Sequence, residues 1–574
     1  MHLNRRRFFH LAATTASVSA LPSCSFAADT SDAPRLPIGM NLAGIADYEP
    51  GFPFKNLMWG ARAWLTRNVD GQGAWNTEQN EAMAIDANGY PVEVPFEGSD
   101  RTEQDVFTIL PNVCKPGRYV LVYEGEGQID VAGRTKIVAS APGRIELEMA
   151  HAVGDGNLEI IRILRSQRGN HLRNIRIVAA EFEQSDLAAE PFLPEVVDYC
   201  KQFHALRFMD WLGTNDSINV HWANRKTLDF FTQTGTQGDA IGFWGSPMEP
   251  WKKRYASGVA IELCVDLANA AKCDAWVCVP HMADDQYITE MAKLVRDRLD
   301  PSLKVYVEYS NEVWNWQFQQ AHWNLHSKRL GELLEKQNIE GWKQGTTPEF
   351  NDFDVAANQV GTNFPERLGI ATHRIHALWE KIFVGIDRNR LVRVAAGQAA
   401  WLDITARCLR TVLSLGKCDA MTVAGYFGPS DEVYEKWAKA GPKLTSDQVI
   451  QDMQQIIKTD SVEMVNDIRD LCQDEGVDFL VYEGGQHIQP KGQEETSYMP
   501  ALKEAQFSAG MHDCYLKQLK LHADAQCRLY MAFSSIGRQG TRYGSWGHLQ
   551  RYDQPISEMP KMRALVEANT PKSQ

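Results

Sequence analysis

Two glutamates, Glu312 and Glu483, each follow a short apolar run at a point where a strand would end. The runs cover residues 305–309 and 479–482. A pair of carboxyl groups about 5 Å apart can break a glycosidic bond with retention of configuration, because one protonates the leaving oxygen while the other attacks the anomeric carbon. The chemistry within reach of this pair is therefore glycoside hydrolysis by double displacement.

Both glutamates also have a structural explanation. Glu312 could be an acid at a helix start, where the helix dipole favours negative charge. Glu483 stands beside Gly484 and could simply precede a turn. Glu308, inside the first apolar run, is expected to be a buried, paired structural acid and not a catalyst.

The elements that must position these residues are alternating strands and helices. Continuous apolar runs separated by helical patterns are typical of parallel strands covered by helices. Eight such runs predict an α/β fold, a closed (β/α)8 TIM barrel, whose reacting groups lie at the carboxyl ends of the strands. The runs are residues 36–42, 205–209, 274–279, 304–309, 391–395, 420–423, 478–482 and 528–533.

A different pattern interrupts the barrel. Residues 68–183 contain short strand-like runs separated by Gly, Asn and Pro, which predicts an antiparallel β-sandwich. We expect the first β/α unit over 36–65, with a short helix at 54–65. The sandwich is then inserted after that unit, and residues 190–570 complete the catalytic barrel.

With these strands assigned, the sequence resembles the GH-A clan of retaining glycoside hydrolases. Ser310-Asn311-Glu312 after the fourth strand resembles the clan's acid/base motif, and Tyr482-Glu483-Gly484 after the seventh resembles its nucleophile motif. The clan includes cellulases, mannanases, xylanases and arabinofuranosidases. The chain is also similar to secreted bacterial proteins labelled cellulose-binding or uncharacterised.

The resemblance implies further roles. Arg207 would contact the nucleophile and keep it ionised, Tyr426 would orient it, and Asn311 would hold the sugar's 2-hydroxyl. Other substrate-binding candidates follow strands or lie in mouth loops, where flat aromatic faces suit sugar rings. They are His281, Trp211, Trp314 and Trp546.

His281 is followed by Asp284 and Asp285, which raises the alternative of a metal site. No second histidine stands at ligand spacing, so contacts to sugar hydroxyls explain these residues better. No metal and no cofactor are expected. The eleven cysteines form no CxxC pair, which argues against both a zinc site and a disulfide scaffold.

The N-terminus has the features of an export signal. Paired arginines precede two aromatic residues in Arg5-Arg6-Arg7-Phe8-Phe9, and a weakly apolar stretch and small residues follow. Residues 1–27 are expected to be a twin-arginine signal peptide, which places the mature protein in the periplasm or outside the cell. Cys24 offers the alternative of a lipid anchor. No later stretch reaches the ~20 apolar residues of a membrane span.

Composition narrows the function classes. The chain has 574 residues and a formal charge of −14, without a basic cluster beyond the N-terminus, so nucleic acid is a poor candidate partner. The sequence therefore predicts a secreted retaining glycosidase acting on a β-linked oligo- or polysaccharide. The alternatives are a carbohydrate-binding protein on a catalytically retired barrel and a structural envelope protein.

Overall fold

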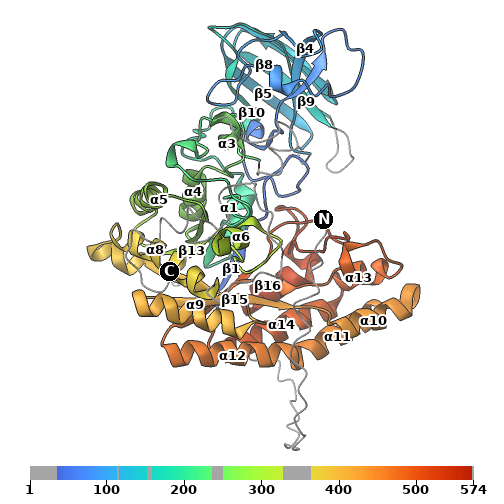
Figure 1. Ribbon diagram of the computed structural model, residues 1–574. Coiled ribbons are helices and arrows are strands. Elements are labelled where there is room, and N and C mark those ends of the chain that lie inside the picture. The colour runs from blue at the N-terminus through green and yellow to red at the C-terminus, as the bar shows by residue number, and fades with distance from the viewer. Residues whose placement is uncertain (1–34, 113–114, 151–157, 236–249, 327–363, 572–574) are drawn as a thin grey trace, which may run out of the picture.

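The computed structural model describes residues 35–112, 115–150, 158–235, 250–326 and 364–571. Eight parallel strands close into a barrel in the order of the chain (Figure 1). Each predicted run coincides with one strand, which confirms the (β/α)8 barrel. The strands are β1 (Ile38–Asn41), β11 (Ala205–Arg207), β12 (Asp274–Val279), β13 (Val305–Tyr309), β14 (Leu391–Ala396), β15 (Ala420–Phe427), β16 (Asp478–Gln486) and β17 (Leu529–Ala532).

One main helix follows each strand and covers the outside of the barrel. These helices are α1 (Pro194–Cys200), α4 (Ile261–Ala271), α5 (Asp285–Arg298), α8 (Phe364–Glu380), α9 (Leu402–Leu415), α12 (Asp460–Glu475), α14 (Ala509–Asp524) and α15 (Pro560–Ala568). Shorter helices lie in the connections: α3 (Pro250–Tyr255), α6 (Gln319–His326), α10 (Asp431–Ala440), α11 (Ser446–Lys458) and α13 (Met499–Ala505). Local signals fix their starts, as where Asp284 accepts the Tyr287 N–H and caps α5.

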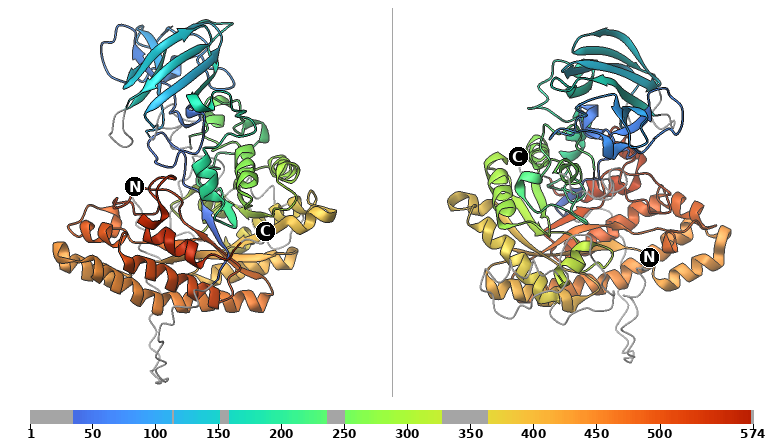
Figure 2. Two further views of the ribbon diagram at one scale, coloured as in Figure 1. Left: turned by 180° about the vertical axis from the view of Figure 1, so that it is seen from behind. Right: turned by 45° about the horizontal axis from the view of Figure 1, so that its top comes forward.

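The inserted domain, blue in Figures 1 and 2, consists of two antiparallel sheets. One has the order β10-β5-β8-β7, and the other has the order β2-β4-β9-β6, with β3 paired to β4. Alternate residues such as Ile161 and Ile163 are fully buried, as expected for strands with one inward face. The strands are β2 (Leu65–Asn68), β3 (Phe96–Glu97), β4 (Glu103–Ile109), β5 (Gly117–Glu124), β6 (Gly127–Gly133), β7 (Thr135–Ala141), β8 (Arg144–Met149), β9 (Glu159–Ser166) and β10 (Arg173–Ala179).

The first β/α unit differs from its prediction. The expected helix at 54–65 is a single 3-10 turn, Leu57–Gly60, and Leu65 already begins β2. The turn ends at Gly60, where the chain becomes extended at Ala61, and a side chain at Gly60 would collide with Pro111 and Phe52. The helix that completes the unit is α1, beyond the sandwich, so the sandwich lies in the connection that leaves the carboxyl end of β1.

The two ends of the insert meet at a narrow neck. Phe54 pairs with Phe192 in an antiparallel bridge. The Lys55 N–H donates to the Pro191 carbonyl at 2.8 Å, and the Leu193 N–H donates to the Pro53 carbonyl at 2.9 Å. The barrel chain therefore leaves and re-enters at one place, and the sandwich stands off one side of the barrel in both views of Figure 2.

The expected signal peptide at residues 1–27 and the candidate lipid-anchor residue Cys24 lie outside the described residues. Within the described part of the chain, no helix combines the length and apolar character needed to cross a membrane.

Candidate active site

Arg207, the last residue of β11, is fully buried among the carboxyl ends of the strands. Its Nε and Nη2 donate to Glu308 Oε2 at 3.1 and 2.9 Å. Its Nη1 donates to Asn41 Oδ1 at 3.0 Å, and its Nη2 also donates to Asn311 Oδ1 at 2.9 Å. Glu483 is more distant, with 3.7 Å between its Oε2 and Nη1. One guanidinium thus joins β1, β11, β13 and β16.

Glu308 is the buried, paired acid that the sequence predicted. It is 1% exposed, and its Oε2 accepts a third hydrogen bond from Trp276 Nε1 at 2.8 Å. A buried carboxylate requires such donors and a countercharge. Because Glu308 holds Arg207 more closely than Glu483 does, much of the arginine's charge is compensated before it acts on Glu483.

Glu312 enters the same region from a tight loop after β13. Ser310 and Glu312 have φ values of 55° and 42°, a left-handed conformation that is uncommon in residues other than glycine and tends to occur at functional sites. Glu312 Oε1 accepts from the Tyr482 hydroxyl at 3.1 Å, and its Oε2 accepts from Asn315 Nδ2 at 2.7 Å. The loop therefore turns the half-buried carboxyl of Glu312 toward β16.

Glu483 lies deeper than Glu312 and is 6% exposed. Burial raises the pKa of its carboxyl well above the usual range, and the negative charge of Glu312 raises it further, while Arg207 acts in the opposite direction. The sequence led us to expect that Arg207 keeps Glu483 ionised. Arg207 acts in that direction on Glu483, while burial and the negative charge of Glu312 act against it.

Tyr426 lies near the end of β15, and the charges of both carboxyls affect the pKa of its hydroxyl. Burial raises the pKa of its hydroxyl well above the usual range, followed by the negative charges of Glu483 and Glu312 and a hydrogen bond with Glu483. The phenol therefore stays protonated and can donate to Glu483. Glu312 and Glu483, from loops after different strands, thus share one site with Tyr426 and Arg207.

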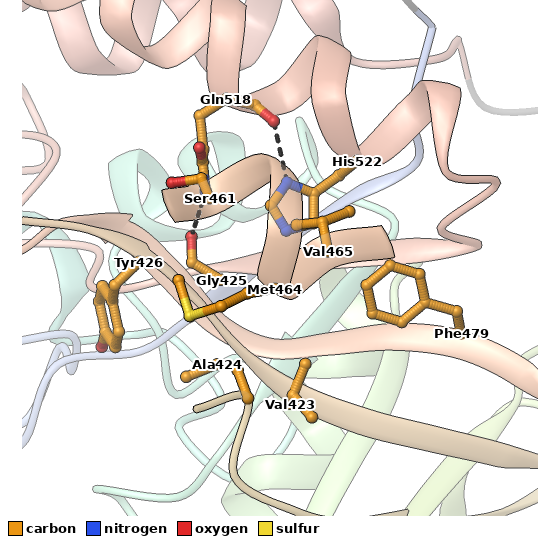
Figure 3. A pocket seen from close by; sticks show the side chains of 11 residues that line it. Val423, Ala424, Gly425, Tyr426, Ser461, Met464, Val465, Phe479, Gln518 and His522 are labelled. Atoms are coloured by element: carbon orange, nitrogen blue, oxygen red, sulfur yellow. Dashed lines mark hydrogen bonds between the residues drawn. The ribbon is translucent and has the colours of Figure 1, made fainter. Parts of the chain in front are cut away.

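A clamp behind β15 fixes the position of Tyr426. The Gly425 carbonyl accepts from Gln518 Nε2 at 3.1 Å and from the Tyr530 hydroxyl at 2.8 Å. Figure 3 shows Gln518 and His522 above this strand, beside a small pocket of about 10 Å³. Gly484 allows the close approach, since a Cβ there would lie 2.4 Å from the Tyr530 hydroxyl.

Asn311 and His281 are both buried. Besides accepting from Arg207, Asn311 donates from Nδ2 to Asn215 Oδ1 at 3.1 Å. The ring of His281 packs 5.9 Å from that of Trp323, and burial lowers the pKa of His281 to about 3. The imidazole is therefore neutral at ordinary pH.

The acids that follow His281 have structural partners. Asp284 caps α5 and contacts His221 Nδ1 at 2.6 Å, and Asp285 pairs with Arg374 at 2.6 Å. Across the described residues, no group of three or more His, Cys, Asp or Glu side chains is arranged to hold a metal ion.

The three candidate tryptophans have different surroundings. Trp211 is a core residue: it is 1% exposed, its Nε1 donates to the Ala43 carbonyl at 3.0 Å, and Phe54 and Phe208 surround its ring. The expectation that Trp211 stacks on a sugar is therefore wrong. Trp314 is 5% exposed, with its ring 6.3 Å from that of Tyr482.

Trp546 is half-buried and belongs to an aromatic wall beside the carboxyl pair. Its ring centroid lies 5.9 Å from Tyr426, 4.9 Å from His487 and 5.8 Å from Phe533. This wall is the part of the site best suited to contact a flat apolar face of a ligand.

Sequence reasoning missed three residues of the site. Asn41 ends β1 and binds Arg207, and its position after a strand was an available signal. Asp210 follows β11, and its pKa is raised to about 6 by burial, with Arg207 opposing and Glu49 adding to the rise. Tyr482 contacts Glu312. It stands in the motif around Glu483, but no role was expected for it because regular alternation would turn its side chain away from that of Glu483.

No protein-family model matches this sequence, and no curated protein is similar to it. Solved structures with a similar fold include one of two fungal beta-1,4-galactanases, with 11% identity, a TM-score of 0.32, and coverage of 65% of this chain and 91% of that chain. A GH5-4 broad specificity endoglucanase from Clostridium acetobutylicum has 10% identity, a TM-score of 0.33, and coverage of 65% and 89%. The fold assignment rests on the strand order described above and not on these scores.

Proposed function

We propose that this protein is a retaining glycoside hydrolase that cleaves a β-linked oligo- or polysaccharide. The observation that carries the proposal is the convergence of Glu312 and Glu483 on one site beside Arg207 and Tyr426. The negative charge of Glu312 raises the pKa of Glu483, and two carboxyls coupled in this way release their protons in separate steps, so the pair can hold a single proton. A pair with one proton is what double displacement requires.

Glu312 is proposed to give its proton to the leaving oxygen while ionised Glu483 attacks the anomeric carbon and the glycosidic C–O bond breaks. Bound substrate then has to shift the single proton of the pair from Glu483, where burial favours it, to Glu312. Glu312 then takes a proton from water, whose oxygen attacks the same carbon and releases Glu483. The greater exposure of Glu312 suits a group that must meet the leaving group and water. Asn311 is proposed to donate its second amide hydrogen to the sugar's 2-hydroxyl.

The test is a screen of the mature protein against a polysaccharide panel, with the anomer of the first product followed by NMR. We expect a product of retained configuration and, in an experimental structure, Glu312 and Glu483 carboxyls about 5 Å apart. A product of inverted configuration, or carboxyls far beyond that separation, would contradict the mechanism.

A Glu483→Ala variant that binds the polysaccharide without cleaving it would separate hydrolysis from binding alone. The control is Asp478→Asn, at the exposed start of the same strand.

Azide rescue separates the roles of the two glutamates. Glu312→Ala is expected to slow glycosides with poor leaving groups far more than activated aryl glycosides, which scarcely need a proton. Azide then restores turnover and gives a glycosyl azide of retained configuration, because Glu483 still forms the intermediate. Glu483→Ala loses both activities, and azide gives the inverted product. An inverted azide from Glu312→Ala would show that the roles are assigned wrongly.

A further inference from the structure

A β-bulge in β16 places two consecutive side chains inside the site. Val481 pairs with Val423 and Glu483 with Ala424, so Tyr482 has no partner in β15. The register of β16 with β17 also shifts between Val481 and Gly484, the stretch that contains Tyr482 and Glu483. Bulges re-aim side chains that regular alternation would send to opposite faces. As a result, Tyr482 and Glu483 are both buried, and both reach Arg207.

The hydroxyl of Tyr482 holds the other carboxyl of the pair. It donates to Glu312 Oε1 at 3.1 Å, while the ring lies 5.0 Å from the Arg207 guanidinium and 6.3 Å from the ring of Trp314. The backbone is also fixed, since the Tyr482 carbonyl accepts from Asn41 Nδ2 at 3.0 Å. The phenol therefore has little freedom to leave Glu312.

We propose that Tyr482 is a positioning residue for Glu312, and that β16 thereby carries both the nucleophile and the tether that sets the acid's distance from it. The inference rests on the proposed hydrolase function. It goes beyond that function because it assigns the geometry of the pair to one bulge and gives a role to Tyr482, which the resemblance left without one.

The hydrogen bond matters most while Glu312 gives up its proton. As the O–H bond of Glu312 breaks and the leaving oxygen takes the proton, Glu312 becomes a carboxylate. The Tyr482 hydroxyl keeps its own proton, and its hydrogen bond becomes charge-assisted and stronger. Burial, with the charges of Glu312 and Glu483, raises the pKa of Tyr482 well above its usual range, so it remains a donor throughout. An interaction that strengthens in the transition state acts on kcat and not on KM.

The first test is Tyr482→Phe, which keeps the ring and removes the hydroxyl. On an oligosaccharide with a poor leaving group we expect kcat to fall about tenfold or more, the factor that corresponds to a hydrogen bond to a charged group. KM and the rate with an activated aryl glycoside are expected to stay within about twofold of wild type, because the activated leaving group needs no proton.

The matched control is Tyr309→Phe. Tyr309 is a buried tyrosine on β13 whose hydroxyl donates to the His281 carbonyl at 3.5 Å and not to Glu312. It is expected to leave the ratio of the two substrate rates unchanged. Equal losses on both substrates in Tyr482→Phe, or the same selective loss in Tyr309→Phe, would overturn the proposal.

Two measurements separate this proposal from the proposed function. The ¹³C signal of the Glu312 carboxyl, assigned with Glu312→Gln, is expected to shift in Tyr482→Phe and not in Tyr309→Phe, whether or not the protein turns over a glycoside. If the signal shifts but no polysaccharide of the panel is hydrolysed, Tyr482 positions Glu312 and the proposed hydrolase function is refuted. If a polysaccharide is hydrolysed but the signal does not shift, the hydrolase function stands and the role of Tyr482 is refuted. In a Glu312→Gln background, Tyr482→Phe is expected to change the rate on the oligosaccharide with a poor leaving group less than twofold, and a full additive loss on that substrate would count against the tether.

Discussion

The two glutamates of the site are held by different means. Glu312 receives one donor on each oxygen and stays half-buried, whereas Glu483 is buried opposite an arginine that it shares. That contrast places desolvation mainly on Glu483, and a desolvated carboxyl next to a second carboxylate retains a proton to higher pH. We therefore expect the pH dependence of the reaction to be set by Glu312 and Glu483 together.

Removing the charge of Glu312 tests this coupling. Glu312→Gln is expected to lower the pKa of Glu483, because ionised Glu483 no longer faces a second negative charge. The readout is the pH dependence of inactivation by an activated 2-deoxy-2-fluoro glycoside, with the label located on Glu483 by mass spectrometry. Its acidic limb is expected to move to lower pH relative to wild type and to the Asp478→Asn control. An unmoved limb would show that the two carboxyls are not coupled.

Strand-end position was enough to predict which residues meet. Arg207, Tyr426, Glu312 and Glu483 stand near the carboxyl ends of four different strands, and barrel closure brings such ends together. The same rule failed for Trp211, which also follows a strand but turns into the core. The direction of a side chain after the last paired residue of a strand depends on how the following loop packs, and the hydrophobic pattern of the sequence does not show that packing.

At the scale of elements, the clamp behind β15 connects helix α14 to the site. Gln518→Met and Tyr530→Phe each remove one of the two donors on the Gly425 carbonyl, directly before Tyr426. Each is expected to reduce kcat about fivefold with little change in KM, the effect of one neutral hydrogen bond. Steady-state kinetics on an aryl glycoside checks this, with Gln202→Ala on the outer face of the barrel as control. A raised KM at constant kcat would contradict a role confined to Tyr426.

Elements with strong periodicity were predictable, and those shaped by tertiary contacts were not. All eight barrel strands are continuous apolar runs, so their burial on both faces is visible in the sequence. The helix expected at 54–65 is absent because the chain turns extended after Gly60 and its end pairs as β2 with β4, a contact distant in the sequence. The bulge at Tyr482 depends on pairing with β15 and β17 together, which a single strand cannot reveal.

For the whole molecule, buried histidines predict acid sensitivity. Burial lowers the pKa of His281, His376 and His548 to about 3 and that of His522 to about 4, against 6.5 in an unfolded chain. Between those values the unfolded chain binds protons that the folded chain does not. The contribution of these histidines to the free energy of unfolding is therefore fully present above pH 6.5 and is lost as the pH drops toward 4. The carboxyls with raised pKa values act in the opposite direction, and they are Glu49, Asp105, Asp210, Asp216 and Glu483. The lowered pKa values of His322 and His373 add to the effect of the four imidazoles.

His376→Leu tests this dependence. Replacing one such imidazole is expected to reduce the fall in stability by up to about 1.4 kcal/mol per pH unit below pH 6.5. Thermal unfolding at pH 7, 6, 5 and 4 measures the slope. His221→Gln, on an exposed side chain, is the control and is expected to keep the wild-type slope. Identical slopes for wild type and His376→Leu would refute the assignment.

Export is proposed to follow the twin-arginine route. Arg5→Lys together with Arg6→Lys is expected to leave the precursor in the cytoplasm, because the paired guanidinium groups are read as an address and not as bulk charge. Cell fractionation and immunoblotting check the outcome, with Arg7→Lys as control. Normal accumulation of the double variant outside the cytoplasm would disprove this route.

The described part of the chain has nine cysteines, and all nine are buried thiols. Burial raises the pKa of thiols such as Cys264, Cys278 and Cys408, which suppresses the thiolate that disulfide exchange requires. An unfolded chain that reached an oxidising compartment would expose all of these thiols at once, and they could then form many non-native disulfides. Under the proposed twin-arginine route, folding comes first and crossing the membrane second, and that order would keep these thiols buried before the protein meets an oxidising compartment.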